Sequence, residues 1–359
     1  MDNDRRFLRR VLPLVVFLFI IPLACALNTS IPTTQKASNP GSTASGTTRK
    51  NPIPIGKLIS IPGWDIKVVE FLRGEAALAV INTPDWQANP LPAGQEYALA
   101  KIFVRCTSLD DSYHSLGISQ MFITGSDYKG YGDTMDSWPQ PEFLFEDMFT
   151  AETVEGWIDA VIPTDEQNLM VVVDDESNGN RTTRFFALEA GASISLPGDL
   201  SNLKPNDLGV DVNNPVPPGQ AAVSPAWEIS TLDSIRGQEA ETIIEKDNGN
   251  YSPPESGTEY LLLQVKLRYI DPTDQPVWIG GSNFYAVDES GGRFSGDWIY
   301  LPTQSDRVWL SSLLLPGAEL QGWVAVIIPA GAAQPVIAFD PGYSTSGATD
   351  QKVVYLAVK

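Results

Sequence analysis

The stretch GWDIKVVEFLRGEAA at residues 63–77 returns as AWEISTLDSIRGQEA at residues 226–240. Trp64 aligns with Trp227 at an offset of 163 residues. A G-x-E-Y motif recurs at the same offset, and a Gly-Trp step followed by Ile-Pro recurs at an offset of 166. Landmarks that keep one order and a nearly constant offset indicate an internal duplication.

Each copy consists of short segments with strand patterns. YALAKIFVRC (97–106) and YLLLQVKLRY (260–269) alternate polar and apolar residues along part of their length, which indicates one wet and one buried face. GWIDAVIP (156–163) and GWVAVIIP (322–329) end at Pro, which cannot donate to a β-ladder. The segment 169–189 predicts a hairpin with Asn-Gly at its turn. No long stretch has a persuasive helical period.

Roughly seven to nine short strands per copy predict a two-sheet architecture. The expected fold is therefore all-β, with two tandem immunoglobulin-like β-sandwich domains at 54–190 and 223–359. A Pro- and Asn-rich linker is expected at 191–222. The Ser/Thr/Pro-rich segment 28–53 is expected to be a flexible tether because it has too few large apolar residues for a core.

The N-terminus has the pattern of an export signal. Arg-rich MDNDRRFLRR precedes the apolar run VLPLVVFLFIIPLACAL, so residues 1–27 are expected to be a signal peptide or membrane anchor. Three outcomes stay open: a lipid on Cys25, cleavage before Leu27, or an uncleaved N-terminal helix. A lipobox usually has an aliphatic residue where Pro22 stands. The expected location is the cell envelope, on the outer face of the cytoplasmic membrane.

The signal, the tether and the repeated pattern of G-x-E-Y, alternating strand and G-W-x-x-x-x-I-P resemble a class of bacterial lipoprotein domains. This class is the telokin-like, immunoglobulin-like family of domains of unknown function. The resemblance covers both copies, about three quarters of the chain. It implies extracytoplasmic immunoglobulin-like sandwiches and no particular activity, so it assigns no functional residues.

Charge and composition exclude some functions. The chain has 44 acidic and 24 basic residues and a formal net charge of −20, which repels phosphate backbones and argues against a nucleic-acid partner. We interpret the acidic surface mainly as a source of solubility, and attraction of cationic partners is the alternative interpretation. Cys106 ends a predicted strand and is expected to be a buried, inert thiol.

No motif assigns catalysis, a metal or a cofactor. His114 is the single histidine, which removes multi-histidine metal sites and most His-based triads. No nucleophile elbow, phosphate loop or dinucleotide fingerprint occurs. The segment 174–185 resembles the first half of a calcium loop, but Phe185 stands where the bidentate Glu belongs, so a turn is favoured. A hydrolase with paired carboxylates stays an alternative.

Aromatic residues are the remaining candidates for binding. The Trp residues that recur between the copies favour a core role. Tyr128, Tyr131 and Trp138 occur in copy-specific loops, where they could stack on a sugar or anchor a protein. We expect a membrane-anchored, non-enzymatic binding or scaffolding protein for an unknown protein or glycan ligand. The alternatives are a carbohydrate- or cell-wall-binding module and the carboxylate hydrolase.

Overall fold

The computed structural model describes most of the chain beyond residue 44. The ranges are 45–82, 87–110, 112–132, 147–176, 180–247, 251–288, 292–294, 307–342 and 353–358. All of them belong to one compact unit, Pro40–Lys359. The predicted signal segment with Cys25 lies outside these ranges, as does Trp138. Among the described helices, none combines the length and apolar character needed to cross a membrane.

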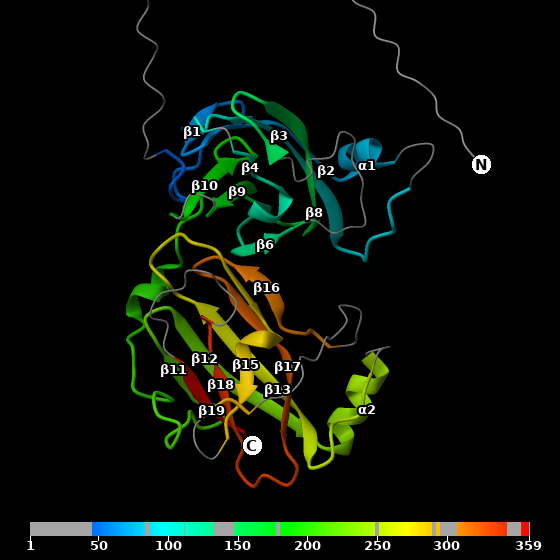
Figure 1. Cartoon of the computed structure of the whole chain (residues 1–359), viewed down its shortest axis with the longest axis vertical. Helices are drawn as coiled ribbons and strands as arrows, with labels where there is room; N and C mark the ends of the chain where they lie inside the picture. Colours follow the sequence, from blue (N-terminus) through cyan, green and yellow to red (C-terminus); the bar gives the residue numbers. More distant parts are fainter. Residues whose placement is uncertain are drawn as a thin grey trace, which may run out of the picture. The chain divides into compact units, whose positions relative to one another are not determined.

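The first half of the unit is a β-sandwich (Figure 1). One antiparallel sheet has the order β1 (Ile59–Ile61), β2 (Trp64–Arg73), β3 (Gln95–Cys106) and β8 (Thr153–Pro163). The other contains β10 (Thr182–Ala187), β9 (Met170–Asp175), β5 (Met121–Thr124) and β6 (Lys129–Tyr131). A separate ribbon pairs β4 (His114–Ser115) with β7 (Asp147–Met148).

The second half repeats this plan. Its long sheet has the order β11 (Ala221–Val223), β12 (Trp227–Arg236), β13 (Thr258–Tyr269) and β17 (Glu319–Pro329). Its core also takes in β15 (Phe284–Ala286), β18 (Val336–Phe339) and β19 (Val354–Ala357), with β14 (Val277–Gly280) and β16 (Ser311–Leu314). The described residues also contain three 3-10 turns: Ile118–Gln120, Gly198–Asn202 and Gly281–Asn283.

The two halves share irregularities as well as strand order. The pairing of β2 with β3 shifts register between Val68 and Glu70, and the pairing of β12 with β13 shifts between Thr231 and Asp233. These positions are 163 residues apart, the offset of the sequence repeat. The prediction of an all-β fold made of sandwich domains is confirmed.

The cores follow the alternation of the strands. The recurring Trp residues are buried as expected, with exposed fractions of 0% for Trp64, 1% for Trp227, 5% for Trp157 and 8% for Trp323. Cys106 is a buried free thiol, as predicted. Trp64 and Trp227 pack inside the sandwiches, whereas Trp157 and Trp323 lie on the outer face of the long sheets.

Two short helices, which the sequence patterns did not predict, cover these outer faces. They are α1 (Glu75–Ile81) and α2 (Gln238–Asp247). Each follows a glycine with positive φ, Gly74 or Gly237, which ends the strand and turns the chain back onto the sheet. Each buries only two apolar side chains four residues apart, so the helical period is too short to stand out.

The expected tether and linker are partly structured. Ile53 is fully buried in the first core, and its N–H donates to the carbonyl of Phe185 at 2.8 Å. Val216 of the linker is fully buried in the second core. The domain boundaries expected at residues 53 and 222 therefore lie inside structured chain. We call residues 45–53 the strap.

Candidate functional site

A shared sheet joins the two sandwiches. Strand β6 of the first half pairs with β16 of the second, so six strands run in the order β10-β9-β5-β6-β16-β14. Leu313 lies opposite Gly130, and the N–H of Leu315 donates to the carbonyl of Tyr128 at 2.8 Å. A Cβ on Gly130 would stand 2.7 Å from Leu313 Cδ2, so the close approach of these strands requires glycine.

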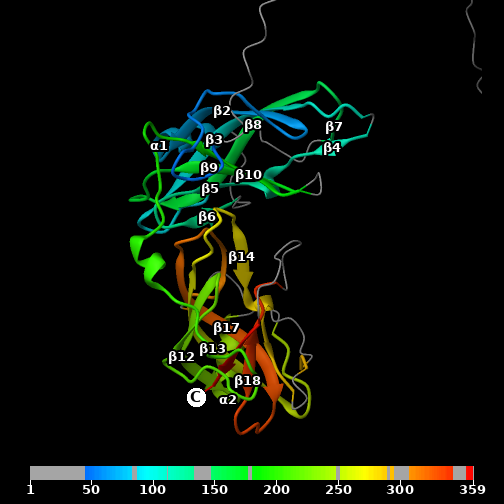
Figure 2. The ribbon, with the colours of Figure 1, turned by 90° about the vertical axis from the view of Figure 1, so that its left-hand side faces the viewer.

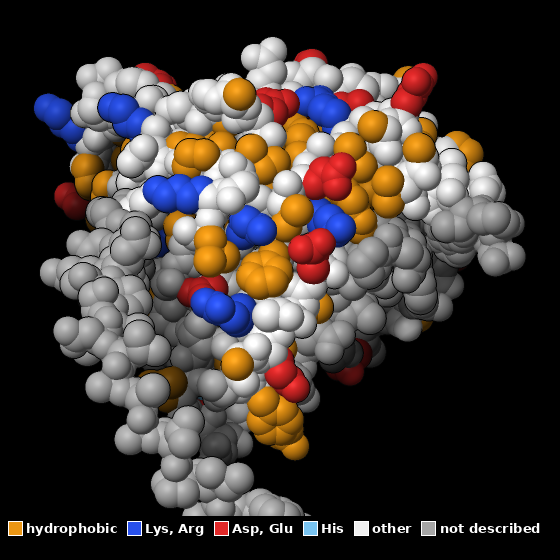
Figure 3. All heavy atoms as spheres, turned by 90° about the horizontal axis from the view of Figure 1, so that it is seen from above, with side chains coloured by type: hydrophobic (Ala, Val, Ile, Leu, Met, Phe, Trp, Pro, Cys, Tyr) orange, Lys and Arg blue, Asp and Glu red, His pale blue; other side chains and the backbone are white. Residues whose placement is uncertain are grey.

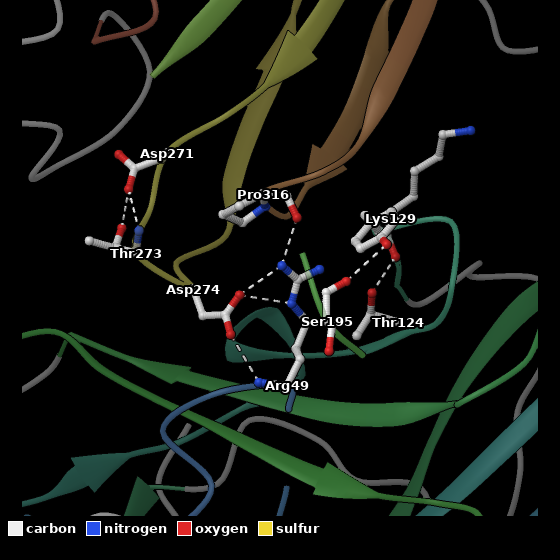
Figure 4. Close-up of polar contacts among 9 residues, drawn as sticks. Arg49, Thr124, Lys129, Ser195, Asp271, Thr273, Asp274 and Pro316 are labelled. Atoms are coloured by element: carbon white, nitrogen blue, oxygen red, sulfur yellow. Dashed lines mark hydrogen bonds and ion pairs between the residues drawn. The ribbon is translucent and has the colours of Figure 1, made fainter. Parts of the chain in front are cut away.

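Arg49 of the strap links the two halves (Figure 4). Its side chain is 1% exposed, and its guanidinium points to the carboxylate of Asp274 and the carbonyl of Pro316. Nε and Nη2 donate to Asp274 Oδ1 at 2.9 and 2.7 Å, the backbone N–H donates to Oδ2 at 3.0 Å, and Nη2 donates to the Pro316 oxygen at 2.7 Å. The Nη1 atom of Arg49 is buried without a hydrogen-bond partner among the described residues. The bonds of Nε and Nη2 to a carboxylate and a carbonyl nevertheless constrain the position of this cation strongly.

The strap is bound to the first sandwich at the same time. Phe185 N–H donates to Gly46 O and Ala187 N–H to Ile53 O, both at 2.8 Å. Ile194 N–H donates to Arg49 O at 3.0 Å. The strap therefore lies along the edge of β10 while its arginine reaches the second sandwich.

Tyr128 belongs to this junction and not to an exposed loop. Its ring lies 5.1 Å from the Arg49 guanidinium, and its hydroxyl donates to Ser195 O at 3.1 Å. A Cβ on Gly317, which has φ +105°, would stand 2.9 Å from the same ring. Tyr128 itself has φ 65°. Tyr128 is therefore half-buried against neighbouring chain, and its surface-binding role stays a prediction.

Tyr131 also lacks the expected exposure. It packs against the first core, and its hydroxyl donates to Glu166 Oε2 at 2.8 Å. Burial and the neighbouring carboxylates of Asp127 and Glu166 raise the pKa of Tyr131, so its hydroxyl stays protonated. Of the three predicted binding aromatics, Tyr128 lies just before β6, Tyr131 is the last residue of β6, and Trp138 lies outside the described residues.

A second arginine crosses the junction. Arg181 binds Asp174 through Nε and Nη2, at 2.9 and 2.6 Å, and Nη2 also donates to the carbonyl of Pro276 at 2.6 Å. Between the polar links lies an apolar cluster with buried members from both halves: Phe122, Met170, Val172, Phe185, Ala187, Ala192, Ile194 and Leu315. Apolar burial supplies attraction, and the arginines fix the orientation.

Two acidic side chains, Asp127 and Glu166, lie at the turn that precedes β6. Glu166, 5% exposed, accepts hydrogen bonds from Ser126 Oγ at 2.6 Å and from the backbone N–H of Asp127 at 3.2 Å. Burial raises the pKa of Asp127, and the charge on Glu166 adds to this rise. Burial acts on Glu166 too, but its hydrogen bonds from Ser126 and Tyr131 outweigh it and lower the pKa of Glu166. The pair braces a turn.

Two cavities lie away from these carboxylates. One, of about 720 Å³, is lined by the turn after β17 together with Asn213, Asp288 and Phe294. The other, of about 470 Å³, lies beside α1 and is lined by Tyr97 and Glu96. Glu96 is held by Arg73 Nε at 2.6 Å, and Arg236 holds Glu259 at the equivalent place in the second half. This repeated ion pair braces the strand-to-helix corner.

The other expected candidates are local contacts. His114 Nε2 lies 2.7 Å from Asp110 Oδ1. Within the part of the chain that the structure describes, no three His, Cys, Asp or Glu side chains gather as metal ligands would. In the segment that resembles a calcium loop, β9 and β10 pair antiparallel, as the predicted hairpin requires, and the expected Asn-Gly turn lies outside the described residues.

Sequence patterns missed the residues that make the junction. Arg49 stands in a stretch of tether-like composition, and Asp274 stands in a loop. At the repeat offset of 163 residues, Arg49 corresponds to Val212, whereas Asp274 corresponds to Asp111. Both are charged residues in stretches without a binding motif, which is too common a feature to single them out.

Comparisons with known proteins add little. No family model matches the chain, and no curated protein matches it. The yjhA protein from Bacillus subtilis is similar over 38% of this chain and 99% of its own, with 11% identity and a TM-score of 0.28. A putative lipoprotein, ycdA, from Bacillus subtilis subsp. subtilis str. 168 covers 37% of this chain and 38% of its own, with 12% identity and a TM-score of 0.28. Likeness of this size assigns neither a family nor an activity.

Proposed function

We propose that the chain is an extracytoplasmic, membrane-anchored, non-enzymatic binding or scaffolding protein whose two sandwiches act as one rigid body. The junction carries this proposal. It contains a cross-half β-ladder, a shared apolar cluster and the buried Arg49–Asp274 pair. Two sandwiches joined only by a flexible linker would need none of these.

The position of the strap supports a scaffolding role. The Ser/Thr/Pro-rich segment of the sequence runs directly into residues 45–53, which bind both sandwiches. An anchor attached through the strap therefore joins the rigid body at its junction, where both sandwiches are held. Anchoring through Cys25 and membership of the telokin-like family belong to the same proposal.

Glycan binding is the weaker alternative. Stacking on sugars calls for a row of exposed aromatic side chains with parallel faces. On the face shown in Figure 3, apolar side chains are interspersed with Lys, Arg, Asp and Glu. Trp278, 47% exposed, and Tyr113, 65% exposed, come from different sandwiches.

The rigidity of the pair is tested with spin labels on exposed positions of the two halves, Lys57→Cys and Glu255→Cys. The full chain is expected to give one narrow distance distribution by double electron–electron resonance. Replacing Arg49 and Arg181 together by Ala is expected to broaden it. The control is Lys266→Ala, which breaks an exposed ion pair with Glu319. A broad distribution in the unaltered protein would refute the proposal.

A further inference from the structure

One end of the first sandwich exposes three large apolar side chains. Leu109 is 94% exposed, Tyr113 65% and Phe149 45%. Leu109 and Tyr113 lie in the loop between β3 and β4, and Phe149 directly follows β7. Figure 2 shows β4 and β7 side by side at this end. We call these three residues the apolar tip.

The two loops of the tip are tied together by hydrogen bonds. Thr150 Oγ1 donates to the carbonyl of Ser108 at 2.7 Å. Cys106 N–H donates to Glu152 O at 3.0 Å, and Ala151 N–H donates back to Cys106 O at 2.9 Å. The rings of Tyr113 and Phe149 are in contact, with centroids 5.0 Å apart.

Asp110 organises the loop further. Its Oδ1 accepts from the backbone N–H of Ser112 at 3.1 Å and from its hydroxyl at 2.5 Å, and it lies 2.7 Å from His114 Nε2. The hydrogen bonds from Ser112 and His114 lower the pKa of Asp110 to about 2, so this exposed carboxylate keeps its charge. Side chains on a braced frame lose little conformational freedom on binding.

We infer that the apolar tip docks into an apolar pocket of a protein partner, and that basic side chains rim this pocket. The inference rests on the proposed binding function and names its contact surface. Exposed aliphatic and aromatic anchors held on a rigid frame are typical of interface hot spots. The exposed carboxylates of Asp110 and Glu152 beside the tip supply the complementary charge.

Three other occupants fit less well. An anionic membrane surface would repel Asp110 and Glu152. The rings of Tyr113 and Phe149 are inclined at 56°, which does not offer a sugar one flat platform. A second copy would bring together two chains that each have a formal net charge of −20.

The test places a photo-crosslinking amino acid at Leu109 of the full chain in its native envelope. The matched control carries it at Val210, which is 52% exposed in the linker. A protein captured from Leu109 and absent from Val210 is then purified and its affinity for the full chain measured. We expect Leu109→Ser and Tyr113→Ser each to weaken binding about tenfold or more, the size of a hot-spot loss.

Two further measurements address the charge and the fold. Asp110→Asn keeps the acceptor oxygen and removes the charge, so it should slow association at low salt and have little effect at high salt. Val210→Ser should change neither affinity nor rate. Unchanged melting temperatures show that the variants fold.

Four outcomes would overturn the inference: crosslinks only to lipid, crosslinks only to a second copy, the same products from both positions, or a partner insensitive to Leu109→Ser. If the purified protein floated with vesicles of phosphatidylethanolamine and phosphatidylglycerol through its apolar tip, a membrane and not a protein would be the partner of the tip. The spin-label distances are independent of the tip, so failure here leaves the rigid-body proposal standing, and the reverse also holds.

Discussion

Arg49 and Asp274 lie 225 residues apart in the chain and form an ion pair. The buried guanidinium of Arg49 binds one oxygen of the Asp274 carboxylate, and the backbone N–H of Arg49 binds the other. Arg49 belongs to the strap, residues 45–53, and Asp274 to the loop between β13 and β14. The pair therefore joins the start of the folded region to its second half, and it explains why the strap is structured.

Removing one partner of this pair should destabilise the protein strongly. Asp274→Ala leaves the guanidinium buried without its counter-charge, which typically costs about 3–5 kcal/mol, whereas Arg49→Met replaces the cation by an apolar chain and should cost less. Urea denaturation measures both. Lys266→Ala, at an ion pair with side chains 44% and 54% exposed, should change stability by less than about 1 kcal/mol. Equal losses of stability in Asp274→Ala and Lys266→Ala would contradict a strong link between Arg49 and Asp274.

A methyl group at residue 130 should separate the shared strands. Gly130→Ala brings a Cβ to 2.7 Å from Leu313 Cδ2, and overpacking of this kind costs roughly 1–3 kcal/mol. Gly132→Ala is the control because, among the described residues other than its chain neighbours, no atom lies within 4 Å of its Cβ. Hydrogen exchange of the Leu315 amide, which bonds to Tyr128 O, should accelerate in the first variant and not in the second. Unchanged protection in both would argue against a ladder between the halves.

The carboxylates of Asp127 and Glu166 should make the stability of the protein depend on pH with opposite signs. The folded state raises the pKa of Asp127 above its ordinary 3.8, so the folded protein binds this proton more readily than the unfolded chain. Relative to Asp127→Asn, the unaltered protein should therefore gain stability as pH falls through the raised pKa toward 3.8.

For Glu166 the sign reverses, because its folded pKa lies below the ordinary 4.5. Its charge contributes stability above pH 4.5 that disappears as pH falls through the lowered value. The advantage of the unaltered protein over Glu166→Gln should therefore shrink on acidification. Denaturation curves between pH 3 and 8 check both variants, and parallel slopes would show that the two groups do not differ as described.

The form of the N-terminus has its own prediction. A lipid on Cys25 should appear by mass spectrometry of the mature protein as an acylated N-terminal cysteine, and Cys25→Ala should release the protein from the membrane fraction. A mature chain that begins with unmodified Leu27 would exclude lipid anchoring.

The sequence predicted the parts of the fold that repeat. Alternating strands, Gly turns and the 163-residue offset are local or periodic features, and they led to two all-β sandwiches with buried Trp64 and Trp227. Helices α1 and α2 were not predicted, because each helix buries only two apolar side chains and so shows no clear helical period. The sequence also could not show that Tyr128 and Tyr131 would be half-buried, because a copy-specific loop aromatic has the same sequence pattern whether water or neighbouring chain covers it.

By itself, then, the sequence determined the class of fold, the duplication and the acidic character of the body, since periodicity and composition act within each segment. Only the tertiary structure decided that Arg49 meets Asp274, that β6 pairs with β16 and that Leu109, Tyr113 and Phe149 share one end. These relationships join residues from distant segments. They depend on how completed sandwiches meet and on which surfaces remain uncovered, and no local pattern encodes either.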